Sequence, residues 1–232
     1  MPSIRAWIGF CQSAKIERDT RAGRLVVALF SSGARRDDEM TRPVGRNTLM
    51  ARSTNHGGDL IRGAVTGLVA GATGTVAMDG LWYRRYRRGG GTQTPLDWEF
   101  SADTNGWEQV SAPGRVGHLV LRRLVGADVP DRWARPTQNV VHWTTGVGWG
   151  APLGLVAGAT TRMRWVWGLG LGVAVFATSY VTLPLAGIYK PIWQYDAATL
   201  AQDLSAHLVY GTATGVALAA LVRHPSSLED HR

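Results

Sequence analysis

The sequence predicts an all-α protein, an integral membrane bundle of four transmembrane helices. Two observations lead to this prediction. Residues 138–189 contain only two charged side chains, Arg162 and Arg164, although charged residues make up 18% of the 232-residue chain. Apolar runs of about 20 residues recur between residues 60 and 222, and a helix of that length crosses the hydrocarbon core of a bilayer. Both observations argue against an ordinary domain surrounded by water.

Residues 1–58 are rich in arginine, serine and aspartate and show no sustained apolar period, so we expect a disordered N-terminal tail there. The apolar run at residues 25–30 (LVVALF) is too short for a membrane span or for the core of a secretory signal peptide. Because the ordered pattern begins only after residue 58, Met40 and Met50 are alternative candidates for the translation start.

The first predicted span covers residues 60–82. Its glycines Gly63, Gly67 and Gly71 recur every four residues and therefore share one helix face. Small residues at this spacing let helix backbones approach closely, which is how helices pack in lipid. This pattern predicts a helix-packing face.

A long polar loop is predicted at residues 83–137, and it opens with the arginine-rich sequence RRYRRGGGTQTP, in which the glycines end the preceding helix. Within it, residues 117–125 (GHLVLRRLV) place apolar side chains opposite Arg122 and Arg123. That pattern is typical of a short amphipathic helix, either packed on the protein or lying at the membrane interface.

Three further spans are predicted at residues 138–159, 165–188 and 198–222, which completes a membrane domain over residues 59–222 and leaves a polar tail at 223–232. The second and third spans are joined by only residues 160–164, so they are expected to form an antiparallel hairpin.

Spans two and four share a sequence pattern. Residues 138–150 (QNVVHWTTGVGWG) and 203–215 (DLSAHLVYGTATG) both place a polar residue, a histidine and two glycines at four-residue steps. The repeat predicts two related helix pairs. It also predicts further packing glycines on these two spans, which are Gly146, Gly150, Gly211 and Gly215.

The predicted topology gathers polar side chains at one membrane face. Span one ends at the face where spans two and four begin, and span three also ends there. Ionisable residues inside a span are costly, so they usually face the bundle interior and have partners. The expected polar cluster consists of Asp79, Gln138, His142, Tyr180, Asp203 and His207.

Three interpretations of this cluster stay open. Its members form structural hydrogen bonds between helices, or they carry protons in a proton- or solute-linked function, or His142 and His207 hold a metal ion or a haem. The sequence contains neither a phosphate-binding P-loop nor a nucleophile elbow, so no catalytic residue is predicted and a non-enzymatic protein is favoured.

The chain carries a formal net charge of +8, and much of the excess lies beside apolar stretches, as at Arg84 and Arg85. Such positions suit lipid phosphates and topology signals better than nucleic acid. The single cysteine, Cys11, excludes a disulfide within the chain and any site made of several cysteines. The expected partners are the lipid bilayer and either further copies of this chain or a larger membrane complex.

Several motifs resemble the YagU-like (DUF1440) group of small bacterial inner-membrane proteins. They are GATGTVAM at residues 71–78, His142 with Gly146, VTLPLAGI at residues 181–188 followed by Pro191 and Trp193, and HLVYG at residues 207–211. The resemblance is strongest over residues 138–222. It implies a four-helix protein of the bacterial inner membrane with cytoplasmic termini, and it supplies no catalytic residue.

Overall fold

The computed structural model describes residues 46–126, 128–157 and 164–223, and this part of the chain is built from helices and loops without a β-strand. Three of its helices are long and apolar enough to cross a membrane, over residues 58–88, 165–185 and 197–222. They belong to α3 (Arg46–Arg88), α8 (Arg164–Leu185) and α9 (Ala197–Arg223). The all-α prediction is therefore confirmed for the described residues, and three of the four predicted spans are helices with the length and apolarity of a membrane span.

The apolar surfaces of these helices face outward. Between 22% and 33% of each apolar window is buried within the protein, and residues such as Ile61, Val76, Val181 and Val216 are exposed. Burying such residues is the main driving force for folding in water, so a water-surrounded protein would cover them. The exposed apolar helices indicate a membrane protein.

The second predicted span, residues 138–159, consists of two helices, α6 (Ala134–Gly148) and α7 (Gly150–Ala157). Pro152 explains the interruption, because it has no N–H to donate to the carbonyl of Gly148 and its ring crowds that carbonyl. Neither helix alone reaches the length of a membrane span.

Helix α3 begins at Arg46, so residues 46–58, predicted as part of the disordered tail, are helical. The physical reason is that an existing long helix is extended at far lower cost than a new one is nucleated. The prediction of a tail over residues 1–45 lies outside the described residues, as does most of the tail predicted at 223–232.

The polar loop predicted at residues 83–137 is largely helical. Helix α3 continues through the arginine-rich segment and ends where Gly90 takes a φ of +91°. It is followed by α4 (Pro95–Glu99), by α5 (Ala112–Val125) and by 3-10 turns at Trp107–Gln109 and Asp131–Trp133. Helix α5 confirms the predicted amphipathic helix and starts five residues earlier, because Pro113 occupies its first turn.

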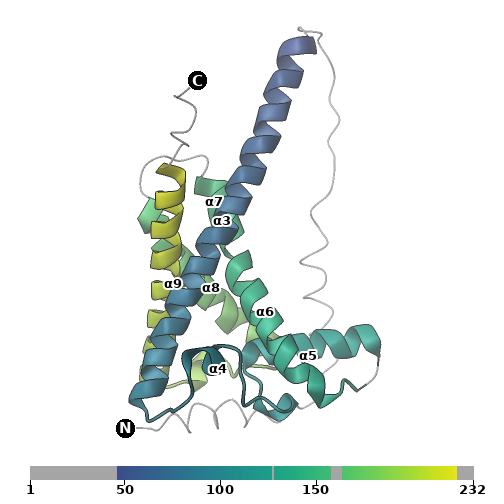
Figure 1. Cartoon of the computed structure of the whole chain (residues 1–232), viewed down its shortest axis with the longest axis vertical. Coiled ribbons are helices and arrows are strands. Elements are labelled where there is room, and N and C mark those ends of the chain that lie inside the picture. Colours follow the sequence, from purple (N-terminus) through teal and green to yellow (C-terminus); the bar gives the residue numbers. More distant parts are fainter. Residues whose placement is uncertain (1–45, 127, 158–163, 224–232) are drawn as a thin grey trace.

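Figure 1 shows the arrangement of these helices. Helix α8 packs on α9, α9 packs on α3, and α3 packs on α6 and α7, while α4 and α5 lie at the end of the bundle where α3 ends and α9 begins. A further 3-10 turn, Ile192–Gln194, joins α8 to α9. The topology therefore brings the end of α3 close to the start of α6 and of α9.

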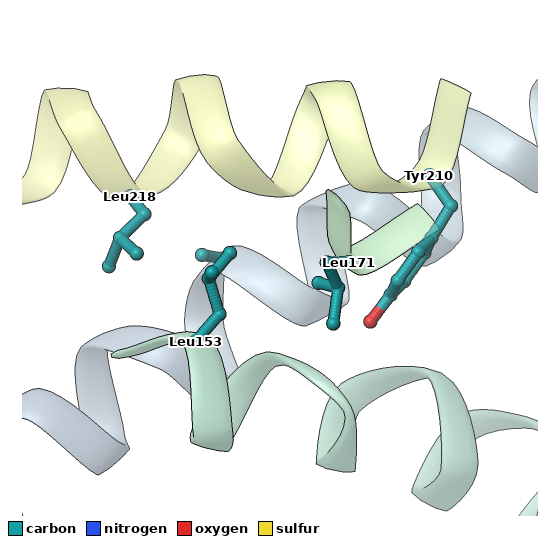
Figure 2. Close-up of a cluster of buried hydrophobic side chains, with 5 residues drawn as sticks. Leu153, Leu171, Tyr210 and Leu218 are labelled. Atoms are coloured by element: carbon teal, nitrogen blue, oxygen red, sulfur yellow. The ribbon is translucent and has the colours of Figure 1, made fainter. Parts of the chain in front are cut away.

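A small apolar core joins four helices (Figure 2). Leu153 of α7, Leu171 of α8, and Tyr210 and Leu218 of α9 pack around Ala70 of α3. Tyr210 is almost fully buried and donates a hydrogen bond of 2.7 Å from its hydroxyl to the carbonyl of Gly146 on α6. This bond ties α9 to α6 across α3.

The predicted glycine faces form the closest helix contacts. A Cβ atom at Gly67 would collide with the carbonyl oxygen of Gly150, and one at Gly150 or Gly154 would collide with the carbonyl of Gly67 or Gly63. On the other side of the bundle, Gly211 meets Gly168 and Gly172 in the same way. The remaining predicted glycines extend these contacts. Gly71 and Gly146 lie where α3 meets α6, and Gly215 lies beside Gly168 where α9 meets α8.

Candidate functional site: a carboxyl and imidazole cluster at one end of the bundle

Asp79 of α3 and His142 of α6 meet near the end of the bundle. The distance between Asp79 Oδ2 and His142 Nε2 is 2.9 Å, and Asp79 is only 6% exposed. The predicted topology placed these residues at one face, and the structure brings them into direct contact. Burying a polar side chain is costly unless it forms a hydrogen bond, so the contact with His142 stabilises Asp79 in its buried position.

A third group, Glu99, completes the cluster, and it was not predicted. One oxygen of Glu99, one oxygen of Asp79 and one ring nitrogen of His142 all lie within 4.8 Å of one another. Glu99 Oε1 and the indole Nε1 of Trp143 are both buried, and neither makes a hydrogen bond of good geometry in the described structure. Two carboxyl groups thus face one imidazole, and a buried acceptor (Glu99 Oε1) and a buried donor (Trp143 Nε1) lie in the same region without a hydrogen bond of good geometry.

Helix α4 carries Glu99 to this position. Thr94 caps its start, since its hydroxyl accepts a hydrogen bond from the N–H of Asp97, and Pro95 occupies the first turn. At its far end, the carbonyl of Phe100 accepts hydrogen bonds from Arg135 (2.9 Å) and Asn139 (3.0 Å) of α6. These contacts hold the polar connection against α6 and fix the carboxyl of Glu99 beside His142.

Aromatic rings hold the other side of α4. The ring of Trp98 lies 5.6 Å from that of Tyr83 and 6.1 Å from that of Tyr86, both on α3. Aromatic pairs at such distances stabilise by roughly 0.5–1.5 kcal/mol beyond their buried area. Helix α4 is therefore clamped between α3 and α6.

The environment raises the pKa of Glu99 from its ordinary value of 4.5 to about 6. Burial is the largest cause, since it disfavours the ionised carboxylate, and the nearby Asp79 carboxylate adds to it. His142 and the indole of Trp143 oppose the shift because both favour the ionised form. The net result is a pKa of Glu99 that lies closer to neutral pH than that of an ordinary glutamate.

A second polar group lies on α8 and α9. Nδ1 of His207 donates to the carbonyl of Asp203 at 2.9 Å and lies 3.5 Å from its carboxylate, while the hydroxyl of Tyr180 hydrogen-bonds the same carboxylate. Tyr180 in turn packs against the rings of Tyr189 and Tyr195. The predicted residues Tyr180, Asp203 and His207 thus meet one another.

Arg85 connects this second group to α3. Its guanidinium donates to the carbonyl of Gln202 at 2.9 Å and to the hydroxyl of Ser205 at 2.7 Å, both on α9. The start of the segment predicted to be a polar loop, residues 83–137, therefore belongs to α3 and contacts α9 through Arg85.

The hydrogen bonds of Gln138 go to residues outside both groups. Its side-chain oxygen accepts a hydrogen bond of 2.7 Å from the N–H of Ser111, and its amide donates to the hydroxyl of Ser101. Gln138 therefore braces the connection between α4 and α5 against α6.

The structure also bears on the metal or haem that the sequence left open for His142 and His207. Among the described residues, the ones close enough to share an ion are Asp79, Glu99 and His142. His207 does not belong to that group and is engaged with Asp203.

No short sequence signal identifies Glu99. The sequence Thr94-Pro95-x-Asp97 marks a helix start, and the large side chains of Trp98 and Phe100 indicate a segment that must pack on something. Neither feature says which face of the bundle α4 covers. The position of Glu99 depends on long-range contacts with Arg135 and Asn139.

No family model, no curated protein and no solved structure matches the chain.

Proposed function

We propose that this chain crosses a membrane four times and that Asp79, Glu99 and His142 form a proton-binding site at one membrane face. The observation that carries the proposal is the approach of the Glu99 carboxyl to the buried Asp79–His142 pair.

The direction of the helices supports a fourth crossing. Helix α9 is antiparallel to α3, because Gly74 lies beside Thr214 and Arg85 beside Gln202. It is also antiparallel to α8, as the contact between Gly172 and His207 and that between Gly168 and Gly211 require. Helices α3 and α8 therefore run in the same direction, so the chain between them has to return to the starting side.

Helices α6 and α7 supply a return path. They run from His142 beside Asp79 to Gly154 beside Gly63, a distance along α3 of about 24 Å at 1.5 Å per residue. The hydrocarbon core is about 30 Å thick, and a proline-broken helix is tolerated in it where neighbouring helices cover the break.

A fourth crossing predicts that both termini lie on one side of the membrane, whereas three crossings would separate them. Reporter fusions at each terminus, scored for cytoplasmic or external activity, distinguish the two. Reporters active on opposite sides would refute the four-crossing proposal. The YagU-like resemblance favours a location of both termini in the cytoplasm of a bacterium. We also propose that the chain assembles with further copies of itself or with a larger membrane complex.

The charge balance of the cluster explains why it would bind a proton. An ionised Glu99 adds one negative charge to the buried cluster beside the Asp79–His142 pair. Adding a proton to Glu99 removes that charge, and a buried site of low polarity favours the neutral state. The titratable groups that face Glu99 are Asp79 from α3 and His142 from α6.

Proton uptake would also control the position of α4. Neutral Glu99 can stay buried beside Asp79, whereas ionised Glu99 is repelled by it and is drawn toward water. Loss of the proton would therefore weaken the packing of α4 against α3 and α6 at the membrane face. A transport or sensing function requires a proton-linked conformational change of this kind.

Infrared difference spectroscopy of the purified protein tests proton binding directly, because a protonated carboxyl has its own carbonyl band. We expect a band that titrates near pH 6 and disappears in Glu99→Gln, but stays in the control Glu108→Gln, an exposed glutamate of the same polar segment. A band unchanged by Glu99→Gln would refute the proposal. A stoichiometric metal ion that is lost in His142→Ala would show a metal site instead.

A further inference from the structure

Helix α5 has an apolar side that is wider than the surface it packs against. Gly114 and Gly117 are buried, and a Cβ at Gly117 would collide with Thr137 of α6. Val120 and Leu124 lie one turn apart at the edge of this buried side, and both are exposed, Leu124 to 77%. Part of the apolar side of α5 therefore has no partner within the described protein.

The opposite side of α5 is basic. With 100° between successive residues, Arg115 and Arg122 lie on the side away from Val120 and Leu124. Arg122 is exposed and lies 3.7 Å from the carboxylate of Asp128, which is fully exposed. An exposed pair of this kind contributes little and is easily exchanged for another anion.

The placement of α5 puts this amphipathic helix at the edge of the bilayer. Figure 1 shows α5 running across the end of the bundle, whereas α8 and α9 run along it. At the same end, Trp133 is half exposed and Trp193 is 80% exposed. Exposed tryptophans are enriched where the hydrocarbon core meets the headgroups, so this end of the bundle lies at headgroup depth.

We propose that α5 is an interfacial helix that inserts Val120 and Leu124 at the boundary between headgroups and acyl chains and binds the phosphates of anionic lipids through its arginines. Guanidinium groups suit phosphate because they are planar, always charged and able to donate two parallel hydrogen bonds. The inference rests on α3, α8 and α9 crossing the bilayer, and it is independent of proton binding at Glu99.

Spin labels measure the depth of α5 directly. In a Cys11→Ser background, single cysteines replace Val120, Leu124 or, as the control beyond the end of α5, Asp128, and the full chain is placed in lipid nanodiscs. We expect the ratio of accessibility to oxygen over that to a water-soluble nickel chelate to be severalfold higher at positions 120 and 124 than at 128. Equal ratios at all three positions would refute insertion.

Lipid composition tests the charge part of the proposal in the unlabelled protein. Amide hydrogens of α5 should exchange more slowly in nanodiscs that contain phosphatidylglycerol than in pure phosphatidylcholine, and Arg115→Gln with Arg122→Gln should abolish this difference. Equal exchange of the unsubstituted protein in both lipids would overturn anionic-lipid binding. Contact between copies of the chain would instead appear as short distances between labels on different molecules, and would overturn the proposal.

Discussion

Replacement of Glu99 by glutamine should make the protein more stable at neutral pH. The glutamine side chain has the same shape and keeps an oxygen that can accept from Trp143, but it carries no charge. In the wild type, the folded pKa of Glu99 is raised from 4.5 to about 6. A raised carboxyl pKa means that folding favours the protonated form, so the stabilisation is complete below about pH 4.5 and is lost as the pH rises through 6.

The size of the effect follows from the same shift. A difference of about 1.5 pKa units corresponds to about 2 kcal/mol in the free energy of unfolding. Because Glu99 is only half-buried and water screens its charge, we expect about half of this, roughly 1 kcal/mol. Above about pH 7, Glu99→Gln should therefore be more stable than the wild type by roughly 1 kcal/mol, and below pH 4.5 the two should be equally stable.

Thermal or chemical unfolding in a mild detergent, repeated from pH 4.5 to pH 7.5, measures this difference. The matched control is Glu108→Gln, which changes the same residue type at an exposed position. The reasoning would be wrong if Glu99→Gln followed the wild type at every pH, or if the control gained as much stability as Glu99→Gln. A wild type that becomes more stable relative to Glu99→Gln with rising pH would reverse the sign and refute the role of burial.

Further predictions concern the helix contacts, and unfolding in detergent measures each of them. Gly67→Ala should destabilise the protein by about 1–3 kcal/mol, since its Cβ collides with the carbonyl of Gly150; Gly80→Ala on the same helix, where a Cβ meets nothing, should instead be neutral or stabilising by up to about 1 kcal/mol. Equal effects of the two substitutions would argue against the close contact. Tyr210→Phe should cost about 1 kcal/mol by removing the hydrogen bond to Gly146. His142→Ala should cost more, about 3 kcal/mol, because it leaves the buried carboxylate of Asp79 without its donor, and a cost below that of Tyr210→Phe would contradict this account.

The fold follows from the sequence where apolar length and small-residue spacing decide it. The three apolar spans and the glycine faces are local patterns, and the contact between Asp79 and His142 follows once the order of the spans is known. The interruption at Trp149 could also be anticipated, because Pro152 disturbs the carbonyl four residues before it. These features need no knowledge of distant contacts.

The candidate site was only partly predictable, because its parts come from segments without a regular pattern. Glu99 reaches the site through hydrogen bonds from Arg135 and Asn139 to the carbonyl of Phe100, and a backbone carbonyl leaves no mark in the sequence. Gln138 has the right helix position for the cluster, yet it bonds Ser111, which lies in the connection that folds back over α6. Both outcomes depend on how residues 89–133 fold against the bundle.

The register between helices explains why the two polar groups differ in chemistry. The sequence repeat matches His142 with His207, but the close contacts match Gly150 with Gly211, since each meets a pair of glycines on the neighbouring helix. This register is shifted by one helical turn from the sequence repeat. In it, His142 of the first helix pair occupies the position that corresponds to Asp203 of the second pair.

Glycine contacts set this register because helices in lipid gain most where their backbones approach closely, and a shift of four residues keeps the glycines on the same face. The polar residues then take whichever partner the register supplies. Asp79 and Tyr180 occupy matching places on α3 and α8, so one helix pair joins a carboxylate to an imidazole and the other joins a phenol to a carboxylate. If the two pairs are related as the sequence repeat predicts, only the first of them has a second carboxyl group, Glu99, at which we propose that a proton binds.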